Sequence, residues 1–129
     1  MSERFVDAIA KLIELTREGS IRWTPKAADE SLKKDPQDRL GTVFEARHKG
    51  RNLRLYERAY RIAGVSPILR ASGLFGEGDW HTVVLLEIVN DEGQVLWTFP
   101  QMNALRDLLA SVRYQSAGVA DFIDELLED

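Results

Sequence analysis

The feature that most constrains the fold is the alternating stretch GTVFEARHKGRNLRLYERAYRIAG, which spans residues 41–64. Its centre is Lys49-Gly50, and glycine supplies the positive φ that a tight hairpin turn requires. A turn there places apolar residues opposite one another on one face and Glu45 opposite Arg54 on the other. The pattern therefore predicts a β-hairpin with a defined register. Because the second arm is longer, its far half is expected to pair elsewhere or form an edge.

A second hairpin is predicted downstream. The segment HTVVLLEIV, residues 81–89, has aliphatic residues on both faces, which is typical of a central strand. The turn NDEGQ, with Gly93 in the left-handed position, leads into VLWTF, residues 95–99. This pairing is expected to place Trp97 near Glu87.

Helical periodicity frames the two hairpins. Residues 3–18 carry one apolar stripe, which Gly19 can end. Residues 101–116 carry a second stripe and residues 119–128 a third, with Gly118 between them. The sequence thus predicts an α+β fold, in which an antiparallel sheet of about four to five strands is packed by an N-terminal helix and one or two C-terminal helices.

The length of 129 residues fits one domain, so we expect residues 1–129 to form a single α+β unit. Within it, residues 26–39 carry four bases and four acids but only one large aliphatic residue. This composition is typical of a solvated loop, and we expect a mobile charged loop at about residues 26–40. Residues 66–80, with three glycines and one proline, are expected to form a connection.

The sequence lacks the residues and motifs that several common kinds of catalytic, metal and cofactor site require. The chain has no cysteine, which excludes disulfides, thiolate zinc sites and thiol nucleophiles. His48 and His81 are the only histidines and show no metal-ligand spacing. There is no phosphate-binding loop, dinucleotide fingerprint or G-x-S-x-G motif. We therefore expect no metal, no cofactor and no catalytic residues, and a non-enzymatic role is favoured.

The distribution of apolar residues along the sequence is the basis for the expected location of the protein. The first residues include acids and no long apolar run, unlike a signal peptide. No stretch approaches the roughly 20 apolar residues that span a bilayer. We expect a cytoplasmic protein that does not enter a membrane.

The second arm of the first hairpin suggests a binding surface. Alternation places Arg54, Tyr56, Arg58 and Tyr60 on one side, and residues 43–62 hold six bases and two acids. Arginines between aromatic rings on a sheet face are typical of single-stranded nucleic-acid binding. The alternative is a solvated strand face whose charges prevent edge-to-edge aggregation. The formal net charge of −4 disfavours a polyanionic partner.

The C-terminal helix is a candidate interface. Its apolar stripe consists of Val119, Phe122, Ile123 and Leu126, and residues 121–129 hold five acids and no base. This helix either covers the sheet or contacts a protein partner.

Two carboxylates are candidates for acid–base chemistry. Glu57 lies on the leucine side of its strand, where Arg61 can neutralise it, and Glu87 lies among aliphatic residues. An inward carboxylate has a raised pKa, as general acids often do.

Three functions follow from these features. The leading hypothesis is a non-enzymatic protein-interaction or regulatory module, acting as a homodimer or in a small complex. The alternative is a nucleic-acid-associated protein that uses the basic and aromatic strand face. The second alternative is a small enzyme with carboxylate chemistry at Glu57 or Glu87.

Overall fold

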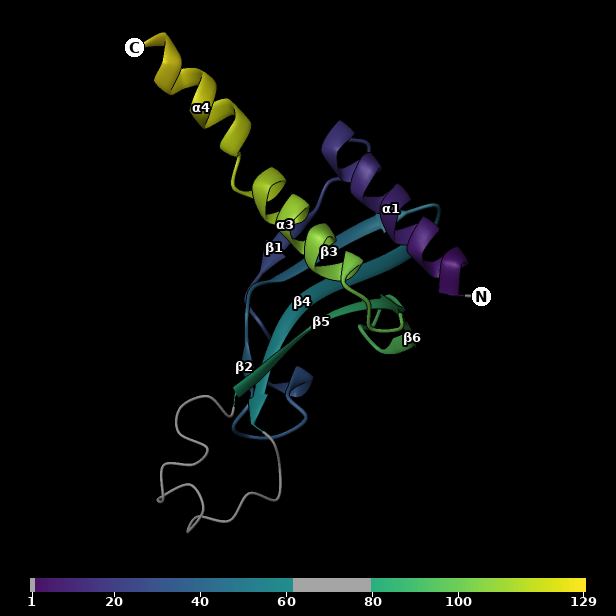
Figure 1. Ribbon diagram of the computed structural model, residues 1–129. Helices are drawn as coiled ribbons and strands as arrows, with labels where there is room; N and C mark the ends of the chain where they lie inside the picture. The colour runs from purple at the N-terminus through teal and green to yellow at the C-terminus, as the bar shows by residue number, and fades with distance from the viewer. Residues whose placement is uncertain (1, 62–79) are drawn as a thin grey trace.

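The computed structural model describes residues 2–61 and 80–129 (Figure 1). The predicted α+β fold is confirmed. The expected connection at residues 66–80 lies outside the described residues except for Trp80. In chain order the elements are α1 (Ser2–Glu18), β1 (Thr24–Lys26), the 3-10 helix η1 (Glu30–Leu32), β2 (Arg39–Leu40), β3 (Val43–His48), β4 (Arg51–Arg61), β5 (Trp80–Val89), β6 (Val95–Thr98), α3 (Ala104–Ser116) and α4 (Val119–Glu128).

The strands form one antiparallel sheet in the order β1-β3-β4-β5-β6. The predicted register of the first hairpin is confirmed, with Glu45 opposite Arg54. Lys49 and Gly50 both have positive φ, as the turn requires. The far half of β4 pairs with β5 on one side and with the short β2 on the other, so the longer arm is not an edge.

The register of the second hairpin differs from the expectation. β6 contains one extra residue, Leu96, between the partners of Ile88 and Val89. Because this bulge shifts the pairing, Trp97 lies opposite Ile88 and not beside Glu87. The Trp97 ring stacks on Phe5 of α1, with 6.3 Å between ring centroids.

One face of the sheet is covered by helices. α1 and α3 lie side by side across this face (Figure 1), and α3 buries Leu105, Leu108, Leu109 and Val112. The sheet contributes the apolar side of each hairpin to the same core. The buried members from the sheet and its approach are Ile21, Trp23, Phe44, Ala46, Leu53, Leu55, Val84 and Leu86.

Part of the opposite face is covered by the segment between β1 and β3. Ala28, Leu32 and Leu40 of this segment pack against a small buried cluster, Val43, Tyr56 and Leu85. The segment at 26–40 that is expected to be mobile thus contributes to a second layer over the sheet, and its mobility stays a prediction.

The last helix stands apart from these layers. Gly118 has a left-handed conformation, with φ of 65°, and separates α3 from α4. Beyond it, α4 extends away from the sheet towards the C-terminus (Figure 1). No residue of α4 is buried.

Candidate functional site

The predicted strand face is built around a buried ion pair. Glu87 of β5 lies directly opposite Arg54 of β4. The Arg54 Nε donates to the Glu87 Oε1 at 2.8 Å, and a second guanidinium nitrogen lies 2.8 Å from the same oxygen. A third nitrogen donates to the Gly93 carbonyl at 3.1 Å. Arg54 is 7% exposed and Glu87 is 6% exposed, so this guanidinium is paired and shielded from solvent.

Tyr56 lies two residues further along the same face. It is buried between Val43 and Leu85. Burial, together with the negative charge of Glu87, raises the pKa of Tyr56 to about 12. The phenol therefore stays protonated at neutral pH, and its ring is part of the second core and unavailable for stacking on a base.

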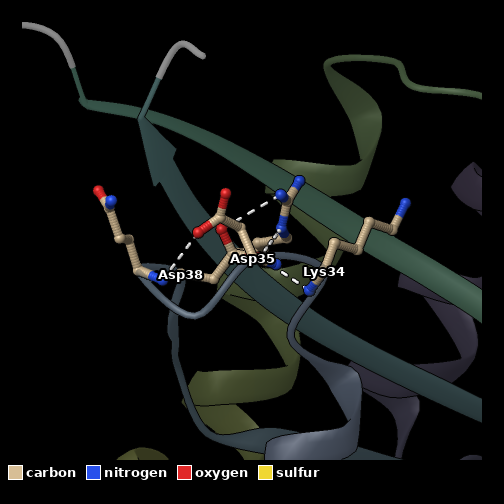
Figure 2. Close-up of polar contacts among 5 residues, drawn as sticks. Lys34, Asp35 and Asp38 are labelled. Carbon is tan, nitrogen blue, oxygen red and sulfur yellow. Dashed lines mark hydrogen bonds and ion pairs between the residues drawn. The ribbon is translucent and has the colours of Figure 1, made fainter.

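Arg58 holds the covering segment on the sheet through Asp38. The Asp38 carboxylate accepts hydrogen bonds from the Arg58 Nε at 2.6 Å and from a terminal guanidinium nitrogen at 3.2 Å. It also accepts from the backbone N–H groups of Lys34 at 3.0 Å and Asp35 at 3.1 Å (Figure 2). These bonds, led by those from Arg58, hold the pKa of Asp38 below its usual range although burial opposes the shift.

Tyr60 is at the far end of β4 and is half-buried. The Arg58 guanidinium carbon lies 4.8 Å from the centre of the Tyr60 ring, and the His81 ring lies 5.8 Å from it. The four predicted binding residues thus share one face of β4, as the alternation indicates. However, Arg54 and Tyr56 are buried, and the solvated-face interpretation is wrong for these two residues.

The two candidate carboxylates lie on opposite faces of the sheet. Glu87 shares the face of Arg54, whereas Glu57 lies on the face that α1 and α3 cover. The Glu57 carboxylate oxygens lie 3.6 Å from an Arg106 guanidinium nitrogen and 4.0 Å from one of Arg113. Glu57 and Glu87 therefore cannot act as an acid–base pair on one substrate. Neither residue lines the groove formed by the end of α1, α3 and the first turn of α4, or the groove along β1, β3, β4 and the end of β5.

Metal-ligating groups show no clustering in the described ranges. Within residues 2–61 and 80–129, there is no group of three or more histidine, cysteine, aspartate or glutamate residues that could hold a metal ion.

Three of the four predicted interface residues on α4, Phe122, Ile123 and Leu126, are brought together on one exposed side of the helix, whereas Val119 is half-buried and lines a groove beside α1 and α3. Phe122 is 58% exposed, Leu126 is 53% exposed and Ile123 is 42% exposed. Leu127, which the sequence interpretation did not include, is 80% exposed. We call Val119, Phe122, Ile123, Leu126 and Leu127 the α4 apolar face. No described helix is both long and apolar enough to cross a membrane.

Sequence reasoning missed Asp38 and the pairing of Glu87 with Arg54. The signal for Glu87 was an acid in the middle of an aliphatic strand, where a charged residue needs a partner. The signal for Asp38 was its place in the turn DPQD, where an aspartate side chain bonds to nearby backbone N–H groups.

Comparison with known proteins identifies no family for the chain. No protein-family model, no curated protein and no solved structure matches the chain.

Proposed function

We propose that this chain is a non-enzymatic protein-interaction module and that helix α4 is its binding element. The observation that carries the proposal is the exposure of the α4 apolar face on a helix that projects from the sheet (Figure 1). Contiguous exposed apolar residues with a polar surround are typical of protein interaction sites. An amphipathic helix of this kind binds by placing its apolar side in a groove of the partner.

The ion pairs on the sheet face opposite α1 and α3 support a protein-interaction role over a nucleic-acid-associated role. Arg54 and Arg58 are the two arginines at its centre, and each is paired with a buried carboxylate, Glu87 and Asp38 respectively. A phosphate group would have to displace a protein partner from each arginine. The net charge of −4 adds a general repulsion of polyanions.

The positions of Glu57 and Glu87 support a protein-interaction role over an enzymatic role. Glu57 and Glu87 lie on opposite faces, and arginines neutralise both. A pair of carboxylates that carries out general acid–base catalysis must reach one substrate.

The proposed role can be tested by site-specific photocrosslinking in cells that naturally express the chain. Leu127 is replaced with p-benzoylphenylalanine, because its side chain is the most exposed on the α4 apolar face. We expect discrete adducts that disappear when Phe122→Asp is added, since a charge in the middle of the apolar face opposes burial.

Lys11 of α1 provides the matched control position, because it is exposed and lies outside α4. The same label at Lys11 is expected to give none of these adducts. Identical adducts from both positions, or no adduct from position 127, would overturn the proposed function.

A further inference from the structure

Helix α4 separates apolar and acidic side chains onto two sides. At 3.6 residues per turn, the five residues of the α4 apolar face occupy one arc. The four acids of α4, Asp121, Asp124, Glu125 and Glu128, occupy the opposite arc; the fifth acid, Asp129, follows the helix, and no base is present. Asp124 and Glu125 border the apolar arc on its two sides. Any surface that covers the apolar face is therefore brought close to negative charge along both borders.

A second α4 is a poor occupant for this face. Residues 121–129 hold five acids and no base, so pairing two copies would bring together two sets of five acids. This like charge disfavours a dimer formed by α4 alone.

Another exposed apolar patch, found among residues 2–61 and 80–129, is also a poor match. It consists of Val6 on α1 and Val95, Leu96 and Trp97 on β6, joined through the stacking of Phe5 on Trp97. The α1 residues next to it include Glu3 and Asp7 but only one base, Arg4. An acidic helix from a second copy would meet no excess of positive charge there.

We propose that the partner of α4 is a different protein, whose apolar groove is bordered by arginine and lysine side chains. This inference rests on the proposed function and specifies the chemistry of the partner. Basic borders would neutralise Asp124 and Glu125 while the groove buries Phe122 and Leu126. The same acidic arc repels an anionic lipid surface, so an anionic membrane is a poor partner for the α4 apolar face.

The inference can be tested with labelled helical peptides and the full chain, using fluorescence anisotropy. One peptide has an apolar leucine stripe bordered by lysine, and a matched peptide has glutamate in place of lysine. At low salt we expect the leucine–lysine peptide to bind at least about tenfold more tightly. We expect Phe122→Asp to weaken binding although it adds a negative charge, because binding requires the apolar face.

Two variants with equal net charge separate local from general electrostatics. The triple variant Asp124→Asn/Glu125→Gln/Glu128→Gln is expected to weaken binding about tenfold, since each exposed ion pair contributes modestly. Asp121 is kept because an acid in the first turn stabilises the helix. The control, Asp7→Asn/Glu14→Gln/Glu92→Gln, removes three exposed charges elsewhere and is expected to change binding less than about twofold.

The outcomes distinguish this inference from the proposed function. Equal binding of both peptides, with loss on Phe122→Asp, would overturn the basic-bordered partner but keep α4 as the binding element. Equal weakening by the two triple variants would also overturn it. A photocrosslinked adduct of twice the mass of the chain would identify a second copy and contradict a different protein as partner. Binding that is unaffected by Phe122→Asp would overturn both proposals.

Discussion

Replacing Glu87 with alanine is expected to lower the free energy of unfolding by about 3–5 kcal/mol. The substitution leaves the Arg54 guanidinium buried, with the Gly93 carbonyl as its remaining partner among residues 2–61 and 80–129. An uncompensated charge in a site of low dielectric constant strongly destabilises the folded state. Glu87 also lies beside Tyr56 in a second core, so the cavity adds to the loss.

Urea unfolding followed by circular dichroism measures this effect. The double variant Arg54→Met/Glu87→Leu serves as the control, because it removes both charges and keeps similar volumes. We expect the double variant to regain most of the stability that Glu87→Ala loses. A loss below about 1 kcal/mol for Glu87→Ala would show that the pair is solvated and that this face is not a second core.

Replacing Asp38 with alanine is expected to lower the free energy of unfolding by about 3 kcal/mol. The change removes the partner of Arg58 and leaves the backbone N–H groups of Lys34 and Asp35 without their acceptor. The matched control is Asp35→Ala, which loses one exposed bond to the Gln37 N–H and is expected to cost less than about 1 kcal/mol. Equal losses for the two variants would show that Asp38 does not hold the segment on the sheet.

The Asp38 interaction also has a pH signature. The pKa of Asp38 is lowered in the folded state from its ordinary value of 3.8. Its contribution to stability is therefore complete above pH 3.8 and disappears as the pH falls through the folded-state pKa. Measured from pH 6 towards pH 2, the stability difference between the native chain and Asp38→Asn is expected to narrow below about pH 4. A constant difference would contradict the ionised Asp38–Arg58 pair.

Local sequence determined the first hairpin well because its signals are close together. The Lys49-Gly50 turn fixes the register, and a period of two then assigns every side chain to a face. The second hairpin has an equally clear turn at Gly93, but its register was wrong. The bulge at Leu96 adds a residue to one arm only, and no local feature of VLWTF announces it.

The environment of the strand face could not be predicted from the strand itself. The alternating pattern of arginine and tyrosine residues is the same whether water or another segment of the chain covers the strand face. The partner of Arg54 comes from β5 and the partner of Arg58 comes from the segment before β3, so both pairs depend on tertiary contacts. The covering segment has little apolar periodicity, and its few aliphatic residues are spread over 28–40.

For the C-terminal helix, the sequence predicted the helix itself but not what its apolar stripe faces. Its apolar stripe was predicted from spacing, and the structure has helix α4 at the expected residues 119–128. Spacing cannot tell a stripe that packs on its own sheet from one that faces solvent. The tertiary arrangement supplies that distinction, since α1 and α3 already occupy the face that α4 would otherwise cover (Figure 1).

We expect the α4 apolar face to contribute to binding and not to folding. The most direct test compares Phe122→Ala/Leu126→Ala with Leu108→Ala, which truncates a fully buried residue of α3. By urea unfolding of the isolated chain, we expect the α4 pair to lower the free energy of unfolding by less than about 1 kcal/mol and Leu108→Ala to lower it by about 2–5 kcal/mol. A loss for the α4 pair as large as that for Leu108→Ala would show that α4 packs within its own chain, and it would contradict the account.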